Sequence, residues 1–259
     1  HGAQPDDREL PEAGALAHPR LFPCLLRAAH RADVVHHHGG DAGLAVGPLP
    51  APPQKPERTL MSQNKDRILI TGATGFLGSW IISALVDQDA HVIATDVSLD
   101  HRRLETLRPD LPKDSIAFHI CDVTDAEALE ALIAKTQPTG IIHLAALQIP
   151  MCRVKPALGA MVNIVGHINV FEAARKAGIK RIIYTSSIAA KPRGPDNAPS
   201  NLYGVFKKTD EEIARLYWQD HGLPSLGLRP LYRLRSWPRR WRNLGDHPRH
   251  RGRRFGTGL

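Results

Sequence analysis

The sequence predicts an α/β fold built on a doubly wound parallel sheet, and three observations support this. From residue 67 to 229, short apolar runs alternate with helix-like segments, as such a sheet requires. The run 140–144 is almost wholly apolar, which is typical of a strand buried on both faces. A glycine-rich turn at 71–78 leads from the first strand into the first helix.

The predicted elements follow from these patterns in chain order. In the first half, β-branched and apolar residues predict strands, and Pro109 ends the second helix. The elements expected there are a strand at 68–70, a helix at 76–88, a strand at 91–95, a helix at 101–108 and a strand at 116–121.

The second half continues the alternation as far as a sixth strand. Asp125 caps a helix at 126–136, and glycines suit the left-handed caps that end the two later helices. The elements expected are a strand at 140–144, a helix at 161–177 ended by Gly178, a strand at 180–186, a helix whose end covers 209–221 before Gly222, and a strand at 225–229.

The turn at 71–78 carries three glycines with the spacing expected of a phosphate cradle for a dinucleotide. Gly72 permits the tight turn, Gly75 lets backbone N–H groups approach a pyrophosphate, and Gly78 lets the helix pack closely on its strand. The spacing G-x-x-G-x-x-G has one residue more between the first two glycines than the common dehydrogenase pattern. Alone, this motif is weak, because many strand-to-helix turns contain glycines.

An acidic residue at the end of the second strand strengthens the dinucleotide prediction. Asp96 stands 18 residues after Gly78, where a carboxylate can accept hydrogen bonds from both hydroxyls of an adenosine ribose. The same charge repels a 2′-phosphate, so NAD is favoured over NADP. Arg102 and Arg103 lie nearby and weaken that preference.

Three more candidate sites fall at the carboxyl ends of strands, where an open α/β sheet binds its ligand. Asp122 and Val123 follow the third strand, where Asp122 is either an adenine contact or an ordinary helix cap. Small residues follow the fourth strand and would let the backbone pass close to a cofactor; they are Leu144, Ala145 and Ala146. Ser186 and Ser187 close the fifth strand.

Tyr203 and Lys207 are the strongest chemical signal. Residues four apart on a helix project from one face, and an ammonium beside a phenol favours the phenolate, so Tyr203 can serve as acid and base. Ser187 can hold the substrate oxygen, and Lys207 can also bind the nicotinamide ribose. Such a pair is common on helix surfaces, and it gains weight from the cradle, Asp96 and the strand end that precede it.

Together, residues 65–230 resemble the extended short-chain dehydrogenase/reductase family, specifically the NAD-dependent epimerase/dehydratase group typified by UDP-glucose 4-epimerase. The resemblance implies a Rossmann-type sheet, NAD as cofactor and a small-molecule substrate. It implies that Phe76 and Leu77 contact the pyrophosphate, that Asn163 sits beside the cofactor, and that Ser187, Tyr203 and Lys207 are catalytic. The implied chemistry is hydride removal by NAD with proton removal by Tyr203.

Two segments depart from this group. Relatives carry Val-Tyr-Gly soon after the serine, where this chain has Ile188–Pro192. After Pro230 they continue with Thr-Val-Tyr-Gly, whereas residues 231–259 hold nine Arg and one Asp. A one-base shift can turn codons for Leu231–Arg235 into Phe-Thr-Val-Tyr-Gly, so we expect a frameshift near Pro230 and a chain without its C-terminal lobe. The alternative is a genuine, solvated arginine-rich tail.

Composition separates three regions, predicted as a disordered extension at 1–60, an NAD-binding domain at 61–230 and an aberrant tail at 231–259. The extension has nine Pro, six Gly and no sustained periodicity, and Met61 is the expected natural start. The net charge of +8 arises in the tail, so no nucleic-acid-binding face is expected. Three scattered cysteines predict neither disulfides nor zinc, and no metal site is expected.

The sequence thus predicts a cytoplasmic enzyme without a membrane span, and it leaves a homodimer open. The leading hypothesis is an epimerase/dehydratase-type oxidoreductase acting on a sugar, a nucleotide-sugar or a related hydroxyl or carbonyl substrate. A simple dehydrogenase or reductase of a small carbonyl or polyol is the first alternative. A catalytically silent NAD-binding sensor or interaction module is the second.

Overall fold

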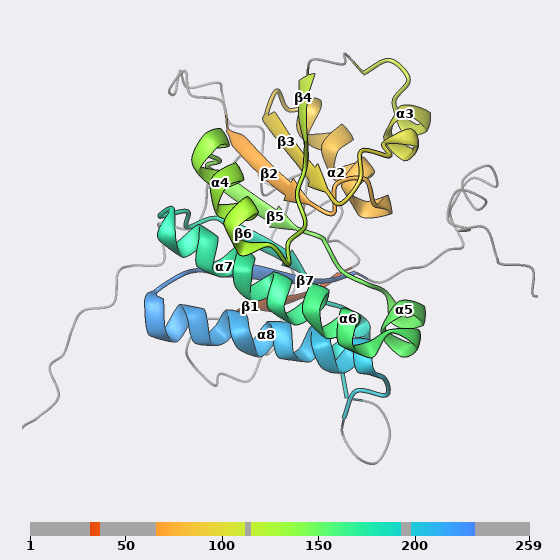
Figure 1. Cartoon of the computed structure of the whole chain (residues 1–259), viewed down its shortest axis with the longest axis vertical. Coiled ribbons are helices and arrows are strands. Elements are labelled where there is room, and N and C mark those ends of the chain that lie inside the picture. The colour runs from red at the N-terminus through yellow and green to blue at the C-terminus, as the bar shows by residue number, and fades with distance from the viewer. Residues whose placement is uncertain (1–31, 37–65, 112–114, 193–197, 231–259) are drawn as a thin grey trace, which may run out of the picture.

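The protein is a Rossmann-type α/β domain, and its computed structural model describes residues 32–36, 66–111, 115–192 and 198–230 (Figure 1). The seven-stranded sheet has the order β1-β7-β6-β5-β2-β3-β4. Neighbouring strands from β4 to β7 are parallel, and β1 is antiparallel to β7. The chain first adds β3 and β4 on one side of β2 and then adds β5, β6 and β7 on the other side. Sheets of this kind bind ligands at the point where the order reverses, which here lies between β2 and β5.

The strands and helices lie close to their predicted positions. The strands are β1 (Ala32–His36), β2 (Arg67–Thr71), β3 (His91–Asp96), β4 (Ile116–Ile120), β5 (Gly140–His143), β6 (Ile182–Thr185) and β7 (Ser225–Pro230). The helices are α2 (Phe76–Val86), α3 (Arg102–Leu107), α4 (Ala126–Thr136), α5 (Ile149–Val154), α6 (Pro156–Ala160), α7 (Gly166–Lys176) and α8 (Leu202–His221). A π-helix, η3 (Met161–Val165), joins α6 to α7, and a short 3₁₀ helix, η4 (Ile188–Ala190), follows β6.

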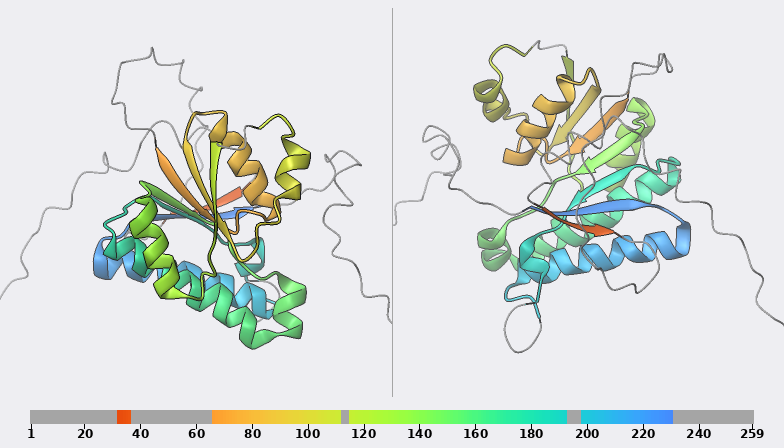
Figure 2. Two further views of the ribbon diagram at one scale, coloured as in Figure 1. Left: turned by 45° about the horizontal axis from the view of Figure 1, so that its top comes forward. Right: turned by 180° about the vertical axis from the view of Figure 1, so that it is seen from behind.

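Helices cover both faces of the sheet, as a doubly wound fold requires. In Figures 1 and 2, α2 and α3 lie on one face while α4, α7 and α8 lie on the other. Side chains of β2 alternate between the two resulting cores: Ile68 and Ile70 pack with α2, and Leu69 packs with α4 and α7. These three residues are at most 1% exposed, so β2 is the central buried strand that its apolar sequence predicts.

One short strand, β1, lies within the predicted extension at 1–60. Its five residues, Ala32–His36, pair with Leu226–Pro230 of β7 in antiparallel register. The physical reason is that β7 ends the parallel sheet, and its unpaired backbone groups accept another strand wherever the chain supplies one. The rest of the predicted extension at 1–60, and all of 231–259 with the predicted frameshift, lie outside the described residues.

The segment before the predicted helix at 161–177 is also helical. Residues 156–176 run continuously through α6, η3 and α7, and α5 precedes them. By length and hydropathy alone this segment, Pro156–Lys176, is apolar enough to cross a membrane, and one face of α7 is part of the core. Val170, Phe171, Ala173 and Ala174 are at most 2% exposed and pack against the sheet.

Candidate NAD-binding and catalytic site

The turn between β2 and α2 has the geometry that its glycines predict. Gly72 is left-handed, with φ of +69°, and a Cβ there would lie 2.6 Å from the backbone nitrogen of Ala145. A Cβ on Gly78 would lie 2.2 Å from the carbonyl oxygen of Ala73, so the first turn of α2 can pack against the β2–α2 turn only without a side chain there. No side chain caps the start of α2 at Gly75, and the first-turn N–H groups keep their affinity for an anion.

A cavity of about 520 Å³ opens at this turn, at the carboxyl ends of β2, β3, β4 and β5. Eleven of the predicted cofactor-binding residues line it: Gly72, Gly75, Phe76, Leu77, Gly78, Asp96, Asp122, Val123, Leu144, Ala145 and Ala146. Six residues that sequence reasoning did not select also line it, namely Thr74, Val97, Cys121, Leu147, Gln148 and Val162. Leu147 and Gln148 extend the lining past β5.

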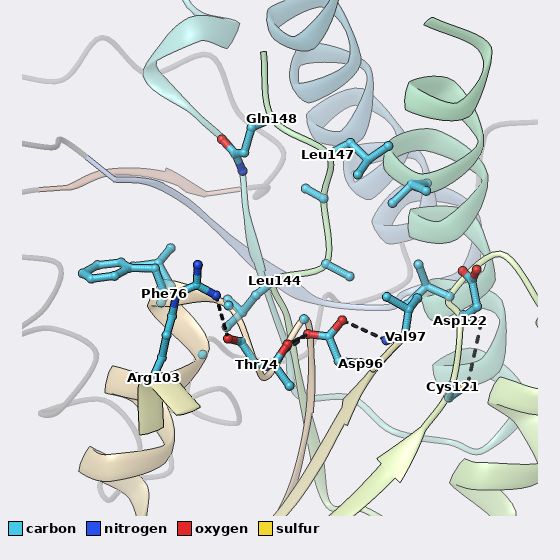
Figure 3. A pocket seen from close by; sticks show the side chains of 18 residues that line it. Thr74, Phe76, Asp96, Val97, Arg103, Cys121, Asp122, Leu144, Leu147 and Gln148 are labelled. Carbon is cyan, nitrogen blue, oxygen red and sulfur yellow. Dashed lines mark hydrogen bonds between the residues drawn. The ribbon is translucent and has the colours of Figure 1, made fainter. Parts of the chain in front are cut away.

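Asp96 and the β2–α2 turn are joined by hydrogen bonds at the floor of this cavity (Figure 3). One carboxylate oxygen accepts from the Thr74 backbone N–H at 3.0 Å and from its hydroxyl at 2.7 Å. The other accepts from the Val97 N–H at 2.8 Å. Each oxygen has two lone pairs. Oδ2 of Asp96 uses both and Oδ1 uses one, so the carboxylate is fixed in direction and Oδ1 retains one acceptor site.

Arg103 also lines the cavity and donates a 3.4 Å hydrogen bond to the Thr74 carbonyl. Arg102 instead pairs with Asp100 at 2.6 Å on the surface, and that guanidinium holds the pKa of Asp100 at about 2. Of the two arginines that the sequence placed near the ribose, Arg103 is therefore the one that faces the cavity.

The structure excludes the helix-cap alternative for Asp122, because its neighbour takes that role. Asp125 is the N-cap of α4, and its carboxylate accepts from the Ala128 N–H at 3.0 Å. Asp122 accepts from the Thr124 N–H at 2.9 Å and lines the cavity (Figure 3). Asp122 thus forms a local turn before the helix, and the cap is Asp125.

Asn163 lies behind the cavity wall. Its side-chain carbonyl accepts from the Leu147 N–H at 2.7 Å, and its amide donates to the Leu147 carbonyl at 2.9 Å. The residue is 1% exposed within η3 and is not among those that line the cavity. Asn163 therefore fixes the backbone at Leu147, which does line the cavity.

The predicted catalytic residues come from two adjoining segments outside this cavity. Ser187 is half-buried and caps η4 by accepting from the Ala189 N–H at 3.1 Å. Tyr203 and Lys207 lie on α8, exposed by 7% and 2%. The two segments are in close contact, because a Cβ on Gly204 would lie 2.3 Å from the Ala189 carbonyl oxygen. This contact brings the segment after Ser187 to the first turn of α8, beside Tyr203.

A buried network that the sequence did not reveal ties β6, β7 and α8 together. Glu211 accepts from the Ser186 hydroxyl at 2.5 Å and from two nitrogens of Arg229 at 2.6 and 2.5 Å. Ser186 and Glu211 are each 2% exposed. Because Ser186 precedes Ser187, this network fixes the end of β6 against α8; an isolated Glu or Arg in the sequence carries no signal of such a pairing.

Comparison with known proteins places this geometry in a family. Residues 68–232 match the model of the NAD dependent epimerase/dehydratase family. The chain belongs to this family. The predicted cofactor, NAD, is the one for which the family is named.

Each relative matches part of this chain. UDP-glucose 4-epimerase of Mycolicibacterium smegmatis is 39% identical over 162 residues, which are 58% of this chain and 51% of the relative. UDP-glucose 4-epimerase of Thermus thermophilus, solved in complex with NAD, is 27% identical with a TM-score of 0.54 and matches 61% of this chain and 53% of that one. L-threonine dehydrogenase of Clostridium difficile is 29% identical with a TM-score of 0.55, over 64% and 53%. The chain spans about half the length of these relatives.

The residues present fit a dinucleotide. The cradle would be closed by any Cβ at Gly72, the α2 terminus is uncapped, and a fixed carboxylate stands at the end of the adjacent strand. An anionic pyrophosphate suits the helix terminus, and ribose hydroxyls suit the carboxylate.

Proposed function

We propose that this chain is the cofactor-binding part of an NAD-dependent epimerase/dehydratase-type oxidoreductase whose substrate is a sugar, a nucleotide-sugar or a related hydroxyl or carbonyl compound. The observation that carries the proposal is the cavity at the sheet's carboxyl edge, which joins the uncapped start of α2 to Asp96. Family membership supports the same chemistry.

In this proposal, different cavity residues bind different parts of the cofactor. The N–H groups of the first turn of α2, at Phe76, Leu77 and Gly78, would bind the pyrophosphate. Asp96 would accept hydrogen bonds from the adenosine ribose, and Asp122 with Val123 would flank the adenine. Ala145 and Ala146, which line the cavity after β5, would let the backbone pass beside the nicotinamide half.

The catalytic part of the proposal rests on Ser187, Tyr203 and Lys207. Bound NAD would supply the hydride acceptor. Ser187 would hold the substrate oxygen by a hydrogen bond while Tyr203 removes or returns its proton. The buried ammonium of Lys207 would stabilise the phenolate and would donate to the ribose hydroxyls.

A simple dehydrogenase is the second candidate function, and the likeness to an L-threonine dehydrogenase favours it. The two differ in their cofactor balance. An epimerase returns its cofactor to the starting state, so NADH does not accumulate. A dehydrogenase releases one NADH for each substrate oxidised. A silent NAD-binding module would bind NAD and turn over neither class of substrate.

The experiment is a turnover screen of the chain with nucleotide sugars, sugar acids and small hydroxy compounds, following NADH absorbance and product epimers. Tyr203→Phe is expected to lower turnover by about 10²- to 10⁴-fold while NAD binding persists. Tyr217→Phe is the matched control, because Tyr217 lies on the same helix and donates to Glu172 at 2.8 Å. Measurable turnover that is equal in wild type and Tyr203→Phe would refute the catalytic assignment.

The cellular location and assembly stay proposals as well. We propose a cytoplasmic protein whose partner is a small-molecule substrate, without a nucleic acid or a membrane. Among the residues that the structure describes, no group of three or more His, Cys, Asp or Glu side chains is placed to hold a metal. A homodimer is tested by the molar mass of the purified chain in solution.

A further inference from the structure

Lys207 forms an ion pair with Asp210, a residue that no sequence motif identified. Its Nζ lies 3.1 Å from Oδ2 of Asp210, one turn further along α8. The side chains of Lys207 and Asp210 are 2% and 0% exposed, so this ion pair is shielded from water. Removing either partner from such a pair leaves an uncompensated buried charge.

The other charged groups nearby do not replace Asp210. Glu211 already accepts from Ser186 and Arg229, and the rings of His143 and His167 lie in the same buried region, 5.3 Å apart. Burial and the Lys207 charge hold the pKa of both histidines well below the usual value, so they are neutral. Oδ1 of Asp210 has no hydrogen-bond partner in the described part of the chain.

We propose that Asp210 is a positioning residue for Lys207. Its carboxylate accepts from the buried ammonium and fixes its direction, so that the remaining N–H bonds are aimed at the nicotinamide ribose and the Tyr203 phenol. This inference rests on the proposed function, because it concerns the use of Lys207 in that site.

The pair also makes cofactor binding dependent on pH. Burial raises the pKa of Asp210 to about 6, although Lys207 opposes that rise. Asp210 is therefore ionised above about pH 6, and it takes up a proton and loses its hold on Lys207 as the pH falls through that value. The other titratable or charged groups around the pair are His143, His167, Tyr184, Cys152, Glu211 and Arg229. Burial raises the pKa of Tyr184 and of Cys152, so neither gains charge near pH 6.

The first test measures the dissociation constant of NAD by calorimetry at pH 5 and pH 7.5. A carboxyl with a pKa of about 6 is roughly one-tenth ionised at pH 5, so wild-type binding is expected to weaken about tenfold there. Asp210→Asn, which is neutral at every pH, is expected to bind NAD well over tenfold more weakly at pH 7.5, with no further change at pH 5. Asp220→Asn, an exposed position on the same helix, is the matched control and should behave as wild type.

A second measurement needs no cofactor and no folded Asp210 variant. In aspartate-labelled wild type, the Asp210 carboxyl carbon is expected to titrate near pH 6 by NMR. In Lys207→Met the midpoint should move to higher pH, because Lys207 stabilises the ionised form. An unchanged midpoint would overturn the ion pair.

The outcomes separate the two proposals. Tight NAD binding by Asp210→Asn with the wild-type pH dependence would overturn this inference and leave the proposed function standing. Failure of the wild type to bind NAD would overturn the proposed function, and with it the use of Lys207 toward the ribose.

Discussion

Gly72→Ala tests the central physical argument, which is that the β2–α2 turn is shaped by two separate requirements at one residue. The first is the left-handed backbone, with φ of +69°. The second is close approach, since a Cβ would lie 2.6 to 2.8 Å from backbone atoms of Leu144 and Ala145. Gly178 isolates the first requirement, because it has the same φ and nothing within 4 Å of its Cβ position.

The magnitudes follow from this difference. The left-handed conformation costs an alanine about 1 kcal/mol at either position. At position 72 the clash adds about 2 kcal/mol, a typical cost of overpacking, because the opposing atoms cannot move away freely. The Leu144 N–H donates to the Thr71 carbonyl at 3.0 Å, which ties that segment to β2. We therefore expect losses of about 3 kcal/mol for Gly72→Ala and about 1 kcal/mol for Gly178→Ala.

The assay is urea unfolding at 25 °C followed by circular dichroism, with NAD binding measured on the folded fraction. The expected difference of about 2 kcal/mol corresponds to roughly 4–8 °C in Tm for a domain of this size. NAD affinity should fall in Gly72→Ala and stay unchanged in Gly178→Ala, which lies outside the cavity. Equal losses of stability in the two variants would refute the close-approach argument.

Three further outcomes are expected. Asp96→Asn should lower the ratio of the NADP to the NAD dissociation constant about tenfold, because a neutral amide no longer repels a 2′-phosphate. An unchanged ratio would contradict this. Below about pH 6.5 the free energy of unfolding should fall by up to about 1.4 kcal/mol per pH unit for each of His143 and His167, because both take up a proton only on unfolding. Asp210 has the opposite effect between about pH 4 and 6, because there it binds a proton more readily in the folded state. His167→Gln should reduce that loss, as measured by urea midpoints at pH 5 and 7. Gly204→Ala should lower stability by about 2 kcal/mol because its Cβ would meet the Ala189 carbonyl, and a loss below about 0.5 kcal/mol would count against that contact.

Local sequence patterns were sufficient to predict the parallel strands of the sheet and most of the residues that line the cavity. Apolar runs, glycine spacing and strand-end residues act over a few positions, so Gly72, Gly78 and Asp96 could be predicted from sequence order. The cavity brings them together because parallel strands all end at one edge of the sheet. The family resemblance added Phe76 and Leu77, which line the same cavity.

Contacts across long sequence separations were beyond the same reasoning. Strand β1 pairs with β7 because β7 ends the parallel sheet. The local sequence of 32–36 carries no information about that edge. The pairing of the Asn163 amide with the Leu147 backbone likewise depends on the packing of η3, which no local sequence pattern indicates.

The sequence by itself determined the fold class, the glycine turn and the order of strand ends, because each depends on the conformational preferences of a few neighbouring residues. The tertiary structure alone decided which charges meet in the interior. Lys207 and Asp210 become a pair because α8 packs against the sheet and excludes water from both, and burial is a property of the whole assembled domain.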